Sequence, residues 1–542
     1  MSKSVAKYET VSYCWGREPG QCFMEIDGQP ELVPGSAVRV LRALRHPTRS
    51  RVLWIDAICI NQCDQTEKSD QVSFMCEIYR HGYNNLIWLG EAEKRHSIEV
   101  EQTLQAVLSN KRRAMENDER FRRLMRSSDS AEVQNGQYLD PGINLAPLQT
   151  LFESEWFCRL WVAQEATLAP KSVCNFGDRS VPLADALDVA VWLVYNSSML
   201  PSALKVSRGI HAARAMWYLL DSKDDRSQDL FMAFLLAQNF QATEPRDHVY
   251  ALLGLYKDQQ PHRCLRGLYL RPNYNKPIGD VFRDATRAWI EDSSSLQTLK
   301  FVQPTKVIAG SPSWTLMFNV GPSGLDADPL CKLGNGFNAD GSLSSPVDFK
   351  DSDTLRVLGA PIDHVNQCCP RFTKARSWAN GEHARHMSMI SSVIEQRREG
   401  TDWRPELGFV LTAGSRLESR SSLASDFAAF LNYSARNPTQ PPVATTSVRV
   451  DKDFARANRW YTKFEQTVYG RRFFMTKRGL AGIGPLDMAC NDVILVIRGS
   501  SIPLVLRPGR NACEYTLVGP CYVFGLMHGE ARECEVSWLS IK

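Results

Sequence analysis

The run LWIDAICINQ at residues 53–62 decides how the rest of this sequence is interpreted. Residues 52–58 are apolar except for Asp56, a pattern that is typical of a strand buried in a sheet. Residues 8–15 and 86–89 are two further short runs of β-branched, aromatic or aliphatic side chains, and we predict strands there as well. Asp56, the polar residue of the apolar run, is therefore a first candidate for a functional side chain.

Segments with helical spacing separate these strands. Ser36 is predicted to cap one helix, and Asp64 with Glu67 predicts a capping box before another. Residues 22–33, with Asp27-Gly28 at their centre, predict a tight hairpin. The alternation of strands and helices favours an α/β fold with a mainly parallel sheet that is covered on both faces.

Composition excludes several classes of protein. Hydrophobic residues make up 43% and charged residues 23% of the 542 residues, so extensive disorder is not expected. Lysine and arginine number 64 against 60 aspartate and glutamate, and a net charge of +4 on so long a chain predicts no nucleic-acid partner. The longest apolar runs fall far short of the ~20 residues that cross a bilayer, so no membrane span is predicted. Residues 1–8 lack an apolar core and do not resemble a secretory signal.

Cysteines and one charged run carry little functional signal. The fifteen cysteines are scattered, many within apolar runs, which favours free thiols in a reducing compartment. No CxxC pair lies near a histidine pair, so no metal site is predicted. The charged run at residues 111–126 fits either a nucleic-acid patch or a solvated helix or loop. Interleaved acidic residues and the near absence of aromatic residues favour the second interpretation.

Four regions differ in character along the chain, as expected for a length of several domains. Residues 8–170 hold the predicted α/β domain, and residues 171–300 form a predicted helical region. Residues 301–445 are richer in Gly, Pro, Ser and Asp and predict an irregular mixed region. Residues 446–542 contain short apolar runs separated by turn-forming residues, which predicts a small β-rich C-terminal module.

Polar and aromatic side chains follow the first two predicted strands. Trp15 and Gly16 come after the first strand, whereas Asp56, Asn61 and Gln62 lie at and beyond the end of the second. Ligands of α/β folds bind outside the carboxyl ends of parallel strands, so these residues could line one crevice. The same residues also fit a structural role, in which they cap turns, tie loops to the backbone or let the chain turn.

A glutamate among aromatic side chains gives a further candidate. Residues 148–168 predict one helix, on which Phe157, Trp161 and Glu165 lie four residues apart on one face. Burial on such a face raises a carboxyl pKa and makes the group a candidate acid, base or charge stabiliser. The alternative is a buried Glu165 that pairs with an arginine or accepts backbone hydrogen bonds. Arg159 is predicted to pair with the glutamate four residues before it, on the solvent side.

At these residues the sequence resembles the fungal heterokaryon-incompatibility (HET) domain family. The resemblance is carried mainly by YETVSYCWG (8–16), LWIDAICINQ (53–62), IWLG (87–90) and WFCRLWVAQE (156–165). Further matching segments lie at 245–255, 312–314, 472–485, 492–508 and 515–530. The resemblance implies a HET domain at residues 8–170 in a cytoplasmic effector of non-self recognition, which triggers programmed cell death when incompatible cells fuse. Only seven residues precede the first block, which implies a truncated N-terminus.

HET domains are similar in turn to Toll/interleukin-receptor (TIR) domains, which implies a TIR-like, flavodoxin-like fold. Some TIR domains cleave NAD with a helical glutamate that follows a tryptophan-containing block, and Glu165 has a similar place after Trp156 and Cys158. By this resemblance Glu165 would stabilise the positive ribosyl centre as nicotinamide leaves, with NAD as substrate and no bound cofactor. The resemblance also implies side chains that hold the nucleotide: Trp15 or Trp161 against a ring, and Asp56, Asn61 or Arg159 at ribose or phosphate.

Functions of different classes follow from this resemblance. The first is an NAD-consuming enzyme, which requires Trp15, Asp56, Asn61 and Glu165 to line one crevice with room for a nucleotide. The second is a non-catalytic signalling module that acts by self-assembly or by binding a protein partner, with those groups bonded to one another and to the backbone. A third is a relative that has lost the death activity and only binds.

Overall fold

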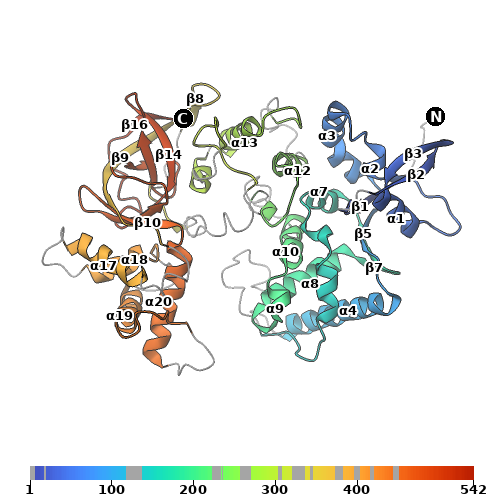
Figure 1. Ribbon diagram of the computed structural model, residues 1–542, viewed down its shortest axis with the longest axis horizontal. Coiled ribbons are helices and arrows are strands. Elements are labelled where there is room, and N and C mark those ends of the chain that lie inside the picture. The colour runs from blue at the N-terminus through green and yellow to red at the C-terminus, as the bar shows by residue number, and fades with distance from the viewer. Residues whose placement is uncertain are drawn as a thin grey trace. The chain divides into compact units, whose positions relative to one another are not determined.

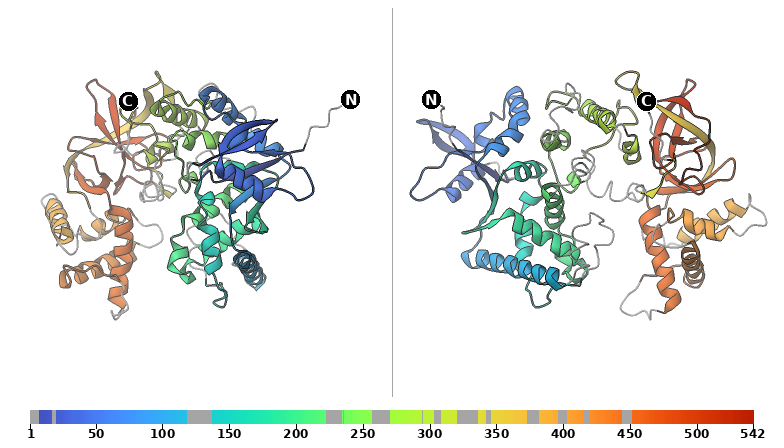
Figure 2. Two further views of the ribbon diagram at one scale, coloured as in Figure 1. Left: turned by 45° about the vertical axis from the view of Figure 1, so that its right-hand side comes forward. Right: turned by 180° about the vertical axis from the view of Figure 1, so that it is seen from behind.

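The computed structural model describes most of the chain and divides it into two compact units. The N-terminal unit comprises Met1–Ile278 and the C-terminal unit Gly279–Lys542 (Figures 1 and 2). The residues that it describes are 7–16, 20–117, 137–221, 234, 236–256, 270–293, 295–302, 308–319, 336–341, 346–372, 382–395, 403–414, 420–443 and 451–542.

A five-stranded sheet forms the centre of the N-terminal unit, in the order β4-β1-β5-β6-β7. Its strands are β1 (Glu9–Tyr13), β4 (Leu53–Trp54), β5 (Asn85–Gly90), β6 (Ser172–Phe176) and β7 (Arg179–Pro182). The neighbours β4, β1, β5 and β6 run parallel, and β7 alone pairs antiparallel with β6. The prediction of a mixed α/β fold with a mainly parallel sheet is therefore confirmed for this part of the chain.

Helices cover both faces of this sheet. The described helices of the unit are α1 (Gly35–Leu44), α2 (Asp56–Cys59), α3 (Gln65–His81), α4 (Lys94–Asn117), α6 (Ala146–Phe152), α7 (Trp161–Leu168), α8 (Leu183–Tyr195), α9 (Ser202–Lys205), α10 (Arg208–Asp221) and α12 (Asp247–Tyr256). Val11 and Tyr13 of β1 pack with apolar residues of α1. Side chains alternate along a strand, so Ser12 points to the opposite face, where it contacts Glu165 of α7. The two faces of β1 thus meet different helices.

The predicted hairpin is confirmed as β2 (Gln21–Ile26) paired with β3 (Gln29–Pro34). The two turn residues have positive φ, 51° at Asp27 and 77° at Gly28. A two-residue turn with both residues left-handed matches the twist of the flanking strands, which explains the Asp-Gly pair. The hairpin is a sheet of its own and is not hydrogen-bonded to the five-stranded sheet.

The predicted strand at residues 52–58 is much shorter than expected. Only Leu53–Trp54 forms β4, because the chain turns into α2 at Asp56. The Asp56 carboxylate accepts a hydrogen bond from the Ala57 backbone N–H, which satisfies a donor at the helix start.

One of the two predicted helix caps is confirmed. Asp64 caps α3, since its side chain accepts hydrogen bonds from the backbone of Thr66 and Glu67. Glu67 does not return the bond to Asp64 but accepts one from the Asn61 backbone N–H. The predicted cap at Ser36 is wrong, because α1 begins one residue earlier and has no side-chain cap.

The helix predicted at residues 148–168 is broken into three pieces. These are α6, the 3-10 helix η2 (Glu155–Cys158) and α7. Between η2 and α7 the chain is extended at Arg159, where the Gln241 backbone accepts a hydrogen bond from the Leu160 N–H and donates one to the Cys158 carbonyl. Phe157 and Trp161 therefore do not share one helical face, contrary to the prediction.

The C-terminal unit contains the predicted β-rich region. Strand β9 (Leu355–Cys368) pairs with β16 (Ser537–Ile541), β12 (Val493–Ile497) and β10 (Arg471–Thr476). Strands β13 (Leu504–Pro508) and β14 (Glu514–Pro520) complete a closed ring in the order β9-β12-β13-β14-β16. The remaining described strands are β8 (Asp348–Phe349), β11 (Ala481–Pro485) and β15 (Tyr522–Val523). Strand β9 lies in the segment predicted to be irregular.

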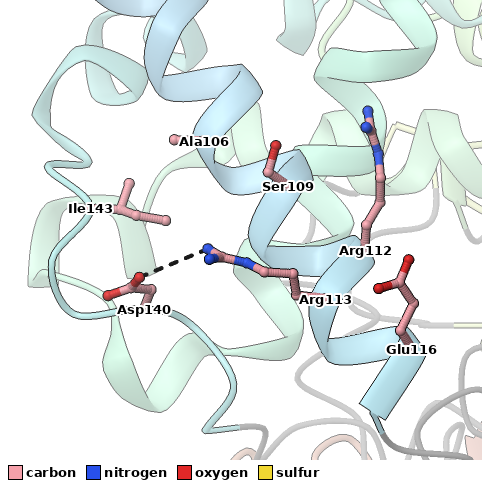
Figure 3. A pocket seen from close by; sticks show the side chains of 7 residues that line it. All are labelled: Ala106, Ser109, Arg112, Arg113, Glu116, Asp140 and Ile143. Carbon is pink, nitrogen blue, oxygen red and sulfur yellow. Dashed lines mark ion pairs between the residues drawn. The ribbon is translucent and has the colours of Figure 1, made fainter.

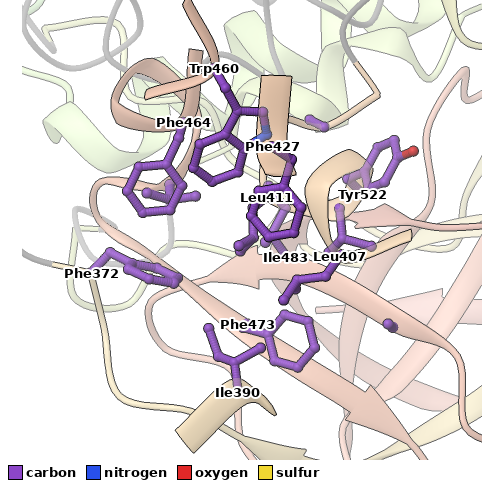
Figure 4. Close-up of a cluster of buried hydrophobic side chains, with 14 of the residues drawn as sticks. Phe372, Ile390, Leu407, Leu411, Phe427, Trp460, Phe464, Phe473, Ile483 and Tyr522 are labelled. Atoms are coloured by element: carbon purple, nitrogen blue, oxygen red, sulfur yellow. The ribbon is translucent and has the colours of Figure 1, made fainter. Parts of the chain in front are cut away.

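Helices pack against the part of this sheet that is formed by β10, β11 and β15. They are α17 (Glu382–Glu395), α18 (Arg404–Val410), α19 (Arg420–Arg436) and α20 (Lys452–Val468), whereas α13 (Ile278–Ser293) begins the unit. Figure 4 shows part of their hydrophobic core, including Phe427 and Trp460. The Trp460 ring centroid lies 4.7 Å from that of Phe427 and 4.4 Å from that of Phe430. Phe473 of β10 and Ile483 of β11 join the same cluster. Among the described helices, none is long and apolar enough to cross a membrane.

Candidate functional site

A chain of buried hydrogen bonds joins β1 to α7 in the N-terminal unit. The Trp156 indole N–H donates to the Ser12 hydroxyl at 2.7 Å, and the Ser12 hydroxyl donates to the Glu165 carboxylate. Tyr79 of α3 donates a second hydrogen bond to the same carboxylate. Glu165 is 2% exposed and Trp156 is fully buried. The acid is thus enclosed, with donors from β1 and α3, and Trp156 of η2 in turn holds Ser12.

Arg159 connects this chain to the carboxyl end of β1. Its guanidinium donates to the Tyr13 backbone carbonyl, and its charge lies close enough to Glu165 and Asp56 to act on both. Arg159 therefore points into the protein and not toward Glu155 on the solvent side, contrary to the prediction. The extended backbone between η2 and α7 turns it inward, because residue 159 is outside either helix. The prediction from sequence spacing required a continuous helix, and for that reason it placed Arg159 on the solvent-facing side.

Asp56 and Trp15 form a second polar contact at the ends of β1 and β4. The Trp15 indole N–H lies 3.1 Å from both carboxylate oxygens of Asp56. The Gln62 side chain donates to the Asp56 backbone carbonyl at 3.3 Å. Burial raises the pKa of Asp56, and the positive charge of Arg159 opposes that rise.

The pKa of Glu165 is raised to about 7, into the physiological range. Burial is the main cause, and the neighbouring Asp56 charge adds to it, whereas Arg159 and the hydrogen bonds from Ser12 and Tyr79 lower the value. A carboxyl group with such a pKa can accept or release a proton near neutrality. Glu165 therefore has a pKa that suits acid or base catalysis, although its carboxylate is shielded from solvent.

Three predicted residues lie apart from this cluster. Asn61 is exposed, and its side chain accepts the Cys63 backbone N–H, as expected for a loop tie. Gly16 is exposed with a φ of 77°, which glycine adopts without strain. The Trp161 indole donates to Asp247, whose other oxygen accepts a bond from Tyr274. The structure thus brings together Trp15, Asp56, Arg159 and Glu165, with Gln62 at their edge.

Trp15 and Glu165 approach β1 from opposite faces. Trp15 packs against the apolar cluster of Tyr13 and α1, whereas Glu165 binds Ser12 on the other face. Asp56 and Arg159 connect the two sides only beyond the last residue of the strand. Asp56, Arg159 and Glu165 therefore act on one another through their charges, but together with Trp15 they do not surround one shared hollow.

Ser12 and Tyr79 are contacts of Glu165 that the sequence did not identify. Ser12 lies between Val11 and Tyr13 in β1, where Thr10 is a second buried hydroxyl residue, so the sequence does not single it out. Tyr79 was visible only as one member of the buried face of α3. Neither pattern says which carboxylate the hydroxyl will meet, because Glu165 is more than eighty residues further along the chain.

A cavity of about 540 Å³ lies elsewhere in the unit, against α4 (Figure 3). Arg113 of α4 and Asp140 face each other across it at 4.0 Å, and the lining also includes Arg112 and Glu116. The part of the charged run 111–126 that the structure describes is the end of α4, and the rest lies outside the described residues. No group of His, Cys, Asp and Glu that could hold a metal ion occurs among the described residues.

Comparison with known proteins accounts for both ends of the chain. The family described as "Heterokaryon incompatibility protein (HET)" matches residues 8–165, and the "Het-6 beta-barrel domain" matches residues 417–537. The chain is 22% identical over 641 aligned residues to "Heterokaryon incompatibility protein 6, OR allele" of Neurospora crassa, an alignment that covers 97% of this chain and 90% of that protein. No solved structure matches the chain. The HET match ends at Glu165, so it contains the whole polar cluster, and the chain is identified as carrying a HET domain at residues 8–165 and a Het-6 β-barrel domain at residues 417–537.

Proposed function

We propose that this chain is an effector of heterokaryon incompatibility whose HET domain is a signalling module, acting through contacts with itself or with a protein partner. The role is suggested by the name of the Neurospora crassa relative, which aligns with nearly the whole chain. The module is favoured over an enzyme by one observation: the Glu165 carboxylate is enclosed and already bonded. In this proposal the outcome of the signal is programmed cell death.

The enclosure of Glu165 argues against turnover in this conformation. A carboxylate that stabilises a ribosyl cation must lie within contact distance of the sugar carbon. Here Ser12 and Tyr79 occupy that position, and Trp15 stands on the opposite face of β1. A nucleotide could reach the acid only after α7 had moved away from the strand. The simplest role for the cluster is to hold α7, η2 and β1 together as one rigid signalling surface.

NAD cleavage is the second function that we consider, because a specific observation favours it. A pKa of about 7 suits an acid or base, and Arg159 and Asp56 lie at the carboxyl ends of parallel strands, where α/β folds bind ligands. In this alternative the domain has a TIR-like, flavodoxin-like fold, NAD is the substrate, and Glu165 stabilises the ribosyl centre as nicotinamide leaves. Arg159 would neutralise a phosphate, and Trp15 would stack on a ring.

We further propose that the protein acts in the cytoplasm. The described cysteines include thirteen free thiols, several of them exposed, as expected where reductants prevent disulfide formation. The partner is proposed to be a protein, either another copy of this chain or the product of an incompatible allele.

The deciding experiment measures growth and NAD together. The full chain is expressed in a fungal host, and purified concentrated protein is incubated with NAD, for wild type, Glu165→Gln and the matched control Glu155→Gln. Glu155 is an exposed glutamate of the same segment. The signalling module predicts growth arrest by wild type without loss of NAD in the host or with purified protein.

Each hypothesis has a result that rejects it. NAD consumption by wild type and Glu155→Gln, abolished in a folded Glu165→Gln, would establish the enzyme and reject the module. Wild-type expression without growth arrest would reject the effector role. Far-ultraviolet circular dichroism of each variant separates loss of activity from loss of folding.

A further inference from the structure

The β2–β3 hairpin presents an apolar outer face on the N-terminal unit. Phe23 and Leu32 lie directly opposite each other and are 78% and 49% exposed. Val33, on the other face of the hairpin, is buried toward α1, so the inner face already has its packing partner. Figures 1 and 2 show the hairpin at the periphery of this unit. An isolated two-stranded hairpin is marginal in water, and an exposed apolar pair on it points to a contact surface.

The two edges of the hairpin differ in what they can bind. Ile26 and Gln29 flank the two-residue turn and form a hydrogen-bonded pair, so the pairs alternate from there. Pro30 and Pro34 then fall at positions whose N–H would point away from β2. Proline has no N–H, and therefore the outer edge of β3 lacks two of its donors. This edge is protected against pairing with another strand.

The outer edge of β2 has no such protection. By the same alternation the N–H and C=O groups of Gln21, Phe23 and Glu25 point away from β3, and none of these is proline. In the part of the chain that the structure describes, β3 is the only strand that pairs with β2. The edge beside the exposed Phe23 is thus able to accept a further strand.

We propose that β2 is a self-association surface, which pairs antiparallel with β2 of a second copy about a two-fold axis at Phe23. This inference rests on the proposed function, because it names the self-contact through which the signalling module would act. The outward groups of residues 21, 23 and 25 then form the new hydrogen bonds. The product is a four-stranded sheet in the order β3-β2-β2-β3, with Phe23 and Leu32 of both copies in one apolar row.

Charge and register favour a second copy as the occupant. With the axis at Phe23, Glu25 faces Gln21 of the other copy, so no like charges are opposed. An axis at Met24 would place Phe23 opposite Glu25, and one at Glu25 would oppose two carboxylates. Registers shifted by one residue would pair outward groups with inward groups and lose the ladder. The register centred on Phe23 is therefore the one that places the two exposed phenylalanines opposite each other without opposing like charges.

The size of the contact predicts a weak dimer. A six-residue strand is about 20 Å long, and one strand pair covers far less than the ~1,200 Å² that stable complexes bury. Pairing would therefore depend on local concentration. Such a contact would be absent in dilute protein and form when the effector is gathered by a partner.

Sedimentation velocity of the full chain over a wide concentration range tests the proposal, with Phe23→Glu, Phe23→Lys and the control Phe74→Glu. Phe74 is an exposed phenylalanine of α3, 59% exposed, so the control removes a similar apolar group elsewhere. Wild type and the control are expected to sediment faster as concentration rises, and each Phe23 variant alone is expected to lose this rise. A mixture of the two Phe23 variants is expected to regain it, because Glu and Lys then meet across the axis.

Three results would overturn the inference. The first is a wild-type protein that stays monomeric at every concentration, and the second is a Phe23 variant that associates like wild type. The third is a mixture of the two variants that fails to regain association, which would mean that Phe23 contacts another surface or another protein. Glu25→Pro removes an outward N–H and keeps Phe23, and it is expected to abolish association as well. Growth arrest is scored separately, so a monomeric but toxic wild type rejects the self-pairing and leaves the effector role standing.

Discussion

Replacing Glu165 with glutamine is expected to change how stability depends on pH. The pKa of this acid is raised from 4.5 to about 7 in the folded protein, chiefly by burial, so the folded state holds the proton more tightly than the unfolded state. The resulting stabilisation is fully present below pH ~4.5 and is lost as pH rises through ~7. The difference between 4.5 and about 7, at about 1.4 kcal/mol per unit, amounts to about 3 kcal/mol.

His248 makes the comparison with the variant necessary. Burial lowers the pKa of its imidazole from 6.5 to about 4, so its stabilisation is present above pH ~6.5 and lost as pH falls toward 4. Between pH ~4.5 and ~6.5 this trend opposes that of Glu165. The two contributions therefore oppose each other in the wild-type curve, whereas the difference between wild type and Glu165→Gln removes the histidine and leaves the carboxyl contribution.

Hydrogen exchange measures this difference in the right part of the chain. Opening free energies of β1 and α7 peptides, corrected for intrinsic exchange, are compared between wild type and variant from pH 5 to 8. The wild-type value is expected to fall by up to about 3 kcal/mol relative to the variant across this range, with Glu155→Gln following wild type. A difference that stays constant with pH would refute the reasoning, since Glu165 would then not titrate near neutrality.

Two further changes test packing around the same elements. Ser12→Ala leaves the buried Trp156 N–H without an acceptor and Glu165 without one donor, so thermal or urea unfolding should show a loss of about 2–4 kcal/mol, whereas Ser180→Ala on the exposed side of β7 should cost less than about 0.5 kcal/mol. Gly209→Ala in α10 would place a Cβ atom 1.9 Å from the Phe152 carbonyl oxygen, and a drop in melting temperature that corresponds to about 1–3 kcal/mol is expected. Equal stability of Ser12→Ala and Ser180→Ala, or an unchanged melting temperature in Gly209→Ala, would contradict the contacts described.

Local sequence signals predicted the structure where the controlling contacts are local. The Asp27-Gly28 turn and the Asp64 cap depend on groups within a few residues, and both form as expected. The break between η2 and α7 depends on Gln241, about eighty residues further along the chain. No periodicity within residues 148–168 reports such a partner, so a continuous helix was the natural prediction.

The long strand β9 illustrates a second limit. Its residues meet β16, β12 and β10 in turn, and the register shifts against β12 and β10, so its side chains do not keep one alternating pattern of apolar and polar residues. The candidate site shows the same division. Asp56, Arg159 and Glu165 were found as residue types that carry chemistry, but their neighbours and the face from which each approaches β1 are set by the sheet order, which spacing does not encode.

The enclosure of Glu165 also sets how an NAD-cleaving HET domain would have to work. Exposing the acid means breaking hydrogen bonds from Ser12 and Tyr79 to a charged group, at about 1.5–3 kcal/mol each. Their sum, about 3–6 kcal/mol, corresponds to an open state populated at roughly one part in a hundred to one in ten thousand. Turnover by isolated protein would be reduced by that factor, and a partner could restore it only by binding the open state more tightly. Catalysis would then require assembly, whereas a signalling module needs the closed cluster intact.

A folded Ser12→Ala variant, which loosens the enclosure of Glu165 but keeps the acid, separates the two mechanisms. It is expected to raise NAD turnover if the domain is an enzyme, and to leave the protein inactive toward NAD if the domain is a non-catalytic module.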